Sequence, residues 1–195
     1  MTNRPTKGSR ITVDPIRCEK AIQTIKQLLS HSPRDLLLFT LGINNGLRVG
    51  DLLQLRWRHL KDLKENNSFI LIEKKTGKRN CLVINKAVYP ALKKYKDELS
   101  PDDNDYVFKS RKGGNQPITV STVNNLVKEW CEKVNLGGHY GAHTLRKTFG
   151  YIQRTKYGAD IELLAKRFNH SSPRITMRYV GILDSEVDML LRNTI

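Results

Sequence analysis

The feature that most constrains the fold is a single change of hydrophobic period within a chain that otherwise has helical patterning. Two β-prone runs, residues 69–72 and 81–84, flank the polar connection EKKTGKRN, which contains Gly77. Such runs on either side of a glycine-bearing turn predict an antiparallel hairpin. The remaining segments repeat apolar residues at helical spacing. We therefore expect an α+β fold that is mainly α with a small antiparallel β-sheet.

Start and stop signals predict where the helices lie. Asp14-Pro15 and Ser32-Pro33 each predict an N-cap followed by proline at the first helical position. Asn44-Asn45-Gly46 predicts that the second helix ends near residue 43, and RVGDLLQLRW predicts a restart. Ser171, Ser172 and Pro173 predict another helix start. The further expected helices lie near residues 86–98, 119–134, 143–156, 160–168, 173–180 and 184–193.

The net charge indicates the class of partner. Thirty-four Lys and Arg against nineteen Asp and Glu leave a formal charge of +15. An excess of this size attracts polyanions, and nucleic acid is the commonest of these in a cytoplasm. An anionic membrane fits less well, because the charge is spread over the chain and not concentrated on one amphipathic helix. A merely solvated basic surface is the simpler alternative. We expect double-stranded DNA as the partner and no membrane contact.

The chain opens with MTNRPTKGSR, which lacks the apolar core of a signal peptide, and its longest apolar stretch is too short to span a bilayer. Three widely spaced cysteines argue against a disulfide framework. These features predict a cytoplasmic protein, associated with the nucleoid in a prokaryotic or phage-infected host. The chain has no glycine-rich phosphate loop, no HExxH motif and no carboxylate cluster. We therefore expect no metal and no cofactor, with phosphate handled by cationic side chains.

Four short motifs contain residues suited to chemistry on phosphate. GLRVGDLLQLRW places Arg48 at a helix start, and KKTGKR crowds lysines into the hairpin turn. HTLRKTFGY places His143 and Arg146 on one helical face. FNHSSPRITMRYVGI places His170 nine residues before Tyr179. Each motif alone has a simpler explanation, such as a solvated turn or a tyrosine that packs in the core with its hydroxyl hydrogen-bonded.

Taken together and in this order, the four motifs resemble the active site of the tyrosine recombinases, the family of the phage integrases and the Xer-type recombinases. The resemblance covers nearly the whole chain from about residue 14. It implies a mainly helical catalytic domain that performs site-specific DNA recombination: integration, excision or inversion. It also implies a covalent 3′-phosphotyrosyl intermediate formed without metal or ATP.

The resemblance also implies residue roles. Tyr179 would be the nucleophile, with Arg48 and Arg146 bound to the phosphate oxygens. Lys75 would protonate the leaving oxygen, although Lys74 and Lys78 are close enough to be alternatives. His143 would assist proton transfer, His170 would hydrogen-bond the phosphate, and Asp51 would fix Arg48. The other expected DNA contacts are Lys74, Lys78, Arg79, Arg111, Lys112, Lys147, Arg174 and Arg178.

The sequence departs from the family pattern in two places within the motifs and in its organisation. Lys147 stands where a histidine is frequent, and Asn169 replaces a frequent glycine. We expect a basic flexible tail over residues 1–13, a catalytic domain over 14–183 and a helical tail over 184–195. That last tail either exchanges between protomers or packs on its own domain. No separate core-binding or arm-binding domain is expected, since only about 13 to 40 residues precede the first active-site segment.

The resemblance further implies a tetramer on DNA, a monomer when free, and accessory DNA-bending proteins as further partners. Two other functions fit the same residues. A type IB topoisomerase would use the same nucleophile to relax DNA, and a non-catalytic relative would bind DNA without cutting it. The short length and the match of FNHSSPRITMRYVGI to integrases favour recombination. Workable residues at all six expected catalytic positions argue against a degenerate relative.

Overall fold

The computed structural model describes residues 13–181, 192 and 194. Their architecture is helical apart from one two-stranded antiparallel sheet, which confirms the predicted fold class. The elements are α1 (Glu19–Leu28), α2 (Pro33–Asn45), α3 (Val49–Leu52), the 3-10 helix η1 (Trp57–His59), β1 (Ser68–Ile72), β2 (Arg79–Val83), α4 (Tyr89–Leu99), α5 (Val120–Lys133), α6 (Ala142–Thr155), α7 (Ile161–Arg167) and α8 (Pro173–Val180).

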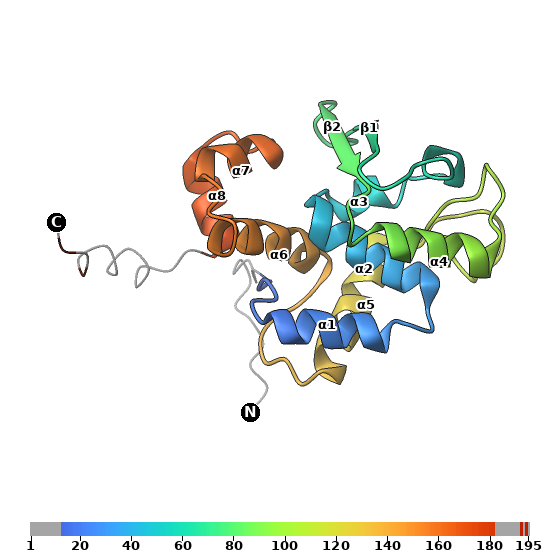
Figure 1. Ribbon diagram of the computed structural model, residues 1–195, viewed down its shortest axis with the longest axis horizontal. Helices are drawn as coiled ribbons and strands as arrows, with labels where there is room; N and C mark the ends of the chain where they lie inside the picture. Colours follow the sequence, from blue (N-terminus) through green and yellow to red (C-terminus); the bar gives the residue numbers. More distant parts are fainter. Residues whose placement is uncertain (1–12, 182–191, 193, 195) are drawn as a thin grey trace, which may run out of the picture.

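Helix α2 forms the centre of the core and lies between α6 and α4 (Figure 1). Its side chains Leu37, Leu38, Phe39 and Leu41 are fully buried, and each such apolar side chain contributes about 1.5–3 kcal/mol by leaving water. Phe39 meets Trp130 of α5 edge-on, with ring centroids 5.9 Å apart. A helix that is apolar on nearly every side can only be stable when other helices surround it.

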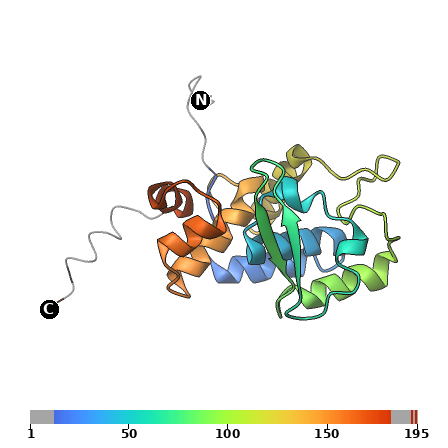
Figure 2. The same cartoon turned by 90° about the horizontal axis from the view of Figure 1, so that it is seen from above.

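The hairpin forms where the change of period predicted it. Strand β1 pairs with β2 in the register Ser68↔Val83 to Ile72↔Arg79. Leu71 and Leu82 face the core, whereas the connection at residues 74–78 is exposed. Seen from above, the two strands run side by side across the middle of the molecule (Figure 2). The hairpin therefore anchors a lysine-rich turn at the molecular surface.

The predicted helix boundaries were right in most places, but the predicted start of the first helix was wrong. Gly46 ends α2 in the left-handed region, with φ of 57°, as the Asn-Asn-Gly sequence predicted. Helix α1, however, begins at Glu19 and not directly after Asp14. The Asp14 carboxylate accepts a hydrogen bond from the backbone N–H of His139 at 3.0 Å. This tertiary contact replaces the helix-capping bond that the local sequence predicted.

The restart in RVGDLLQLRW amounts to one helical turn, α3. Ser172 and Pro173 begin α8 as expected, although the Ser172 side chain makes no capping bond. The predicted tail over residues 1–13 (apart from Val13) and the helix over 184–193 (apart from Arg192) lie outside the described residues. Among the described helices, none is long and apolar enough to cross a bilayer.

Helices α7 and α8 stand beside the hairpin, on the same side of α6 and α2 (Figure 1). Helix α8 approaches α6 closely because Gly150 has no side chain. A Cβ there would lie 2.6 Å from Val180 Cγ1 and 2.9 Å from Phe168 Cζ, well inside ordinary van der Waals contact. This close packing fixes where the side chains of α8 meet those of α6.

Candidate active site

The structure brings all six expected catalytic residues into one region, bounded by α3, the hairpin turn, α6 and the α7–α8 pair. The effects of these residues' charges on one another's pKa values reflect this convergence. Burial lowers the pKa of His143, and the charges of Arg146, Arg48 and Lys75 lower it further. The pKa of Tyr179 is in turn affected by Arg146 and Arg48. Residues up to 131 positions apart in the sequence thus act on one another, as Arg48 and Tyr179 do.

Arg146 is anchored by backbone carbonyls and not by an acid. It is only 2% exposed. Its Nη1 donates to the carbonyl of Gly46 at 2.8 Å and its Nη2 to the carbonyl of Phe168 at 2.7 Å. The guanidinium also lies 4.6 Å from the centroid of the Phe168 ring. The ends of α2 and α7 therefore orient this arginine, and within the described residues no carboxylate forms a salt bridge with it.

Arg48, the N-cap residue of α3, is paired with Glu73 and not with Asp51 as predicted. Its Nη1 donates to Glu73 Oε2 at 2.5 Å, and the Glu73 side chain is fully buried. Burial alone would raise the pKa of Glu73, but hydrogen bonds from Thr76, Asn80 and Arg48 lower it to about 2. The glutamate is therefore ionised at neutral pH and holds the arginine on the side facing the hairpin.

Asp51 instead holds the hairpin. Its Oδ1 accepts the backbone N–H of Lys74 at 2.9 Å, while its Oδ2 is buried and has no hydrogen bond within the described residues. Burial raises the pKa of Asp51. The sequence correctly indicated a carboxylate one turn after Arg48. It could not indicate that the hairpin would supply the carboxylate that pairs with Arg48.

Tyr179 packs on α8 with its hydroxyl turned inward. Its ring centroid lies 5.4 Å from that of Phe168 and 5.1 Å from that of His170. The hydroxyl is buried and makes no hydrogen bond within the described part of the chain. Burial raises its pKa, whereas the nearby Arg146 guanidinium lowers it. Because burial is the larger effect, the pKa of Tyr179 stays above its ordinary value, so the phenol is protonated at neutral pH.

His170 lies just before α8 and is held in the neutral form. Its Nδ1 lies 2.9 Å from the Thr176 hydroxyl oxygen. Burial, followed by the charge of Arg146, lowers its pKa to about 4. In the tautomer whose Nδ1 accepts from the Thr176 hydroxyl, the ring proton is on Nε2, which can donate to an external acceptor. Asn169 precedes it with φ of 51°, a left-handed conformation that asparagine tolerates, which explains why it can replace glycine.

Lys147 does not lie at the surface as a DNA contact should. It is 8% exposed, and its ammonium lies 5.3 Å from the centroid of the Tyr179 ring. The helical spacing of α6 explains this position, since Lys147 follows buried Arg146 on the side that α8 covers. The other expected DNA contacts are all exposed and stay predictions: Lys74, Lys78, Arg79, Arg111, Lys112, Arg174 and Arg178.

Sequence reasoning missed a polar network behind the site. Asn80 Nδ2 donates to Glu73 Oε1 at 2.8 Å, and Asn80 Oδ1 accepts from Arg167 at 2.6 Å. Arg167 also donates to the carbonyls of Asn45 and Cys81. The network ties α7 to the hairpin and to the end of α2. In the sequence these charged and amide residues have the pattern of a solvated surface, so only the fold identifies them.

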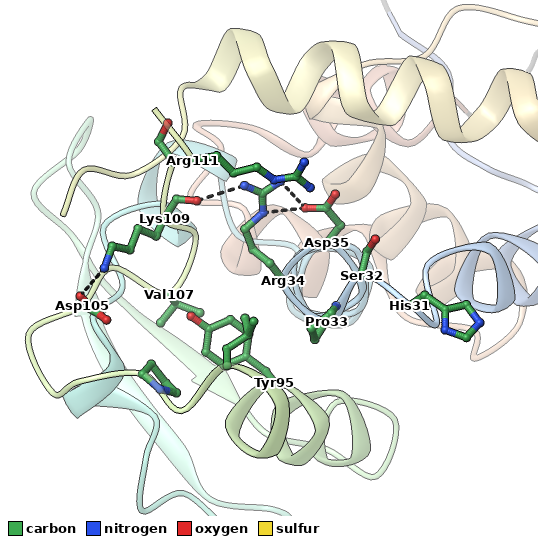
Figure 3. Close-up of a pocket in the computed structure, with 13 residues that line it drawn as sticks. His31, Ser32, Pro33, Arg34, Asp35, Tyr95, Asp105, Val107, Lys109 and Arg111 are labelled. Atoms are coloured by element: carbon green, nitrogen blue, oxygen red, sulfur yellow. Dashed lines mark hydrogen bonds and ion pairs between the residues drawn. The ribbon is translucent and has the colours of Figure 1, made fainter. Parts of the chain in front are cut away.

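The structure was also searched for a metal site and for cavities away from the expected catalytic residues. Among the described residues, no group of three or more His, Cys, Asp or Glu side chains could hold a metal ion. A cavity of about 370 Å³ lies between the start of α2, the end of α4 and the loop that includes Lys109 (Figure 3). Its charges are largely paired within the wall, Arg34 with Asp35 and Lys109 with Asp105. None of the expected catalytic residues lines it.

Known proteins share this sequence pattern. Residues 9–186 match the Phage integrase family. The "Probable integrase/recombinase YoeC" of Bacillus subtilis (strain 168) is 39% identical over 173 residues, which cover 87% of this chain and 90% of that protein. The tyrosine recombinase XerC of Caldanaerobacter subterraneus subsp. tengcongensis is 31% identical over 79% of this chain. The chain spans only 43% of that XerC, so it corresponds to part of the longer relatives.

Known structures share the fold. The crystal structure of XerA recombinase superimposes with a TM-score of 0.75 at 23% identity, covering 96% of this chain and 68% of that one. The XerH site-specific recombinase, solved bound to palindromic difH substrate after cleavage, superimposes with a TM-score of 0.72 at 21% identity, covering 98% of this chain and 55% of that one. The molecule thus has the fold of these recombinases. By sequence, the chain belongs to the phage integrase family and is a tyrosine recombinase.

Proposed function

We propose that this chain cleaves and rejoins DNA at specific sites, with Tyr179 as the nucleophile. The convergence of Tyr179, two arginines, two histidines and the hairpin lysine at one position supports this proposal. Tyr179 Oη attacks the scissile phosphorus, the bond from phosphorus to the 5′-oxygen breaks, and a 3′-phosphotyrosyl ester forms. The reverse attack by a 5′-hydroxyl from a second strand restores the diester and exchanges the strands.

Each of the arginines, histidines and the lysine has a defined task in this reaction. Arg146, rigidly held, and Arg48 donate to the non-bridging oxygens, whose charge grows in the transition state. The tyrosine proton passes to neutral His143, while His170 donates to the phosphate through Nε2. Lys75 gives a proton to the departing 5′-oxygen, so that a hydroxyl leaves and not an alkoxide. The charge of Lys75 lowers the pKa of His143, which supports Lys75 as the acid among the three hairpin candidates.

The nucleophile is tested with nicked duplexes that carry the ends of the element encoding the protein. Such substrates trap the covalent adduct, because the short strand beyond the cleavage site diffuses away. Tyr179→Phe should abolish the adduct and leave DNA binding nearly unchanged. Tyr157→Phe is a matched control, since Tyr157 is 65% exposed, and it should form adduct normally. An adduct formed by the Tyr179→Phe protein would refute the assignment.

The general acid is identified with a duplex whose scissile 5′-oxygen is replaced by sulfur. A thiolate leaves without being protonated, because a thiol ionises near pH 8.5. Replacing the true acid with methionine should slow cleavage of the oxygen substrate about 10²–10⁴-fold and leave cleavage of the sulfur substrate close to normal. Lys74→Met and Lys78→Met, tested in parallel, should show no such rescue if Lys75 is the acid.

We further propose that the protein acts on double-stranded DNA in the cytoplasm as a tetramer, is a monomer when free, and uses accessory DNA-bending proteins. A lambda integrase of the same fold was solved as a dimer bound to a core site. The net charge of +15 supports the DNA contact. The logarithm of the binding constant should fall linearly with the logarithm of salt concentration, because phosphate contacts release counterions. Adduct formation without recombinant product would favour topoisomerase-like relaxation.

A further inference from the structure

Two carboxylates form hydrogen bonds that connect α3 with the hairpin. Asp51, which belongs to α3, accepts the backbone N–H of Lys74 in the hairpin turn at 2.9 Å. Glu73, which belongs to the hairpin, accepts from Arg48 at the start of α3 at 2.5 Å. Glu73 Oε2 also accepts from the Thr76 hydroxyl at 2.6 Å. Asp51 of α3 thus binds the hairpin next to Lys75, and Glu73 of the hairpin binds Arg48 at the start of α3.

Both residues are buried although their side chains are carboxylates. Asp51 is 6% exposed and Glu73 is 0% exposed. A buried carboxylate costs free energy unless hydrogen bonds compensate for its lost hydration. Compensation is complete for Glu73, but the Asp51 Oδ2 atom has no hydrogen bond within the described residues. Stability alone therefore does not account for an aspartate at this position.

The two contacts flank Lys75 on both sides. The residue before it, Lys74, is held through its backbone by Asp51, and the residue after it, Thr76, is held through its side chain by Glu73. Lys75 itself is exposed. The backbone on which the lysine stands is therefore fixed relative to Arg48, while its ammonium keeps the freedom to reach a bound duplex.

We propose that Asp51 and Glu73 are positioning residues that lock the lysine-bearing turn to Arg48, so that phosphate binding and proton delivery occur in a single fixed geometry. The inference rests on the proposed function, in which Lys75 protonates the leaving oxygen. It assigns Asp51 to the proton-delivery step and not to the orientation of the arginine.

The leaving-group experiment separates this role from a merely structural one. Asp51→Ala removes the acceptor for the Lys74 N–H and frees the turn. A displacement of about 1 Å can cost roughly 10²-fold in rate, so oxygen-substrate cleavage should fall by about 10–100-fold. Cleavage of the sulfur substrate, which needs no acid, should fall much less. Asp51→Asn keeps an oxygen acceptor for the same N–H and should restore oxygen-substrate cleavage to within a few-fold of wild type.

Glu73→Gln should slow both substrates, because it loosens Arg48 as well as the turn, but the oxygen substrate should be slowed more. Asp62→Ala, at an exposed carboxylate, is the matched control and should change neither rate. Thermal unfolding and DNA affinity are measured for every variant, so that a misfolded protein is recognised. If Asp51→Ala is misfolded, the cleavage rates of Asp51→Asn on the two substrates decide whether Asp51 has a positioning role.

Three outcomes would overturn the inference, and they can be told apart. If Lys75→Met is rescued by sulfur while Asp51→Ala slows both substrates equally, the positioning role is wrong and the proposed function stands. If Lys75→Met is not rescued by sulfur, the general acid of the proposed function is wrong, and this inference fails with it. If Asp51→Asn is as slow as Asp51→Ala on the oxygen substrate, the hydrogen bond to Lys74 is not what matters.

Discussion

Replacing Glu73 with glutamine tests the electrostatic reasoning about the site directly. The carboxylate accepts hydrogen bonds from Arg48, Thr76 and Asn80. A glutamine amide presents one oxygen and one NH₂ group, so one of these donors must face another donor. Asn80 cannot simply flip its amide in response, because its Oδ1 already accepts from Arg167 and from the N–H of Cys81.

The pKa of Glu73 gives the magnitude. A carboxyl group whose pKa falls from 4.5 when unfolded to about 2 when folded stabilises the fold at neutral pH by roughly 3 kcal/mol. The side chain is fully buried, so solvent screening reduces this value little. The contribution is complete above pH 4.5 and is lost as the pH falls towards 2, because the unfolded chain takes up the proton first. For a domain of this size, roughly 3 kcal/mol corresponds to a Tm shift of about 6–12 °C.

The assay is chemical and thermal unfolding followed by circular dichroism at a series of pH values, with wild type and Glu73→Gln side by side. The stability difference should be about 3 kcal/mol at pH 7 and should shrink steadily between pH 4.5 and 2. Other titrating groups cancel in the difference. Glu65→Gln, at an exposed position, should show no difference at any pH. A Glu73→Gln difference that is absent, or that stays constant down to pH 2, would refute the hydrogen-bonded carboxylate as the source of stability.

Three further predictions follow from the packing and charge of the site. Gly150→Ala should destabilise the protein by about 1–3 kcal/mol through overpacking. It should also slow adduct formation, because the new Cβ would push α8 away. Gly50→Ala is the control, since Gly50 has open space around it, and it should be harmless in the same unfolding and cleavage assays. Arg167→Met should cost about 2–4 kcal/mol in urea unfolding, whereas exposed Lys166→Met should not. His170, with a folded pKa of about 4 against 6.5 unfolded, should weaken the fold as pH falls from 6.5 to 4, and His170→Asn should lose less stability over that range.

The sequence predicted much of the fold because most of its signals are local. Ser32-Pro33, Asn45-Gly46 and Ser172-Pro173 mark helix ends through the preferences of single residues, and the structure follows them closely. The hairpin was predictable because β-branched and apolar runs with a glycine-bearing turn favour one pairing. Asp14 is where local reasoning failed, since a contact with His139, 125 residues away, outweighed a good capping sequence.

For the site, the sequence determined which residues have suitable chemistry, but not which of them are neighbours. The order of Arg48, His143, Arg146, His170 and Tyr179 was enough to indicate a recombinase. Only the tertiary structure decided that Glu73, and not Asp51, binds Arg48, and that Lys147 is buried beside Tyr179. A carboxylate or ammonium looks the same in a sequence whether it is solvated or enclosed. Its partner and its pKa depend on which distant segments the fold packs around it.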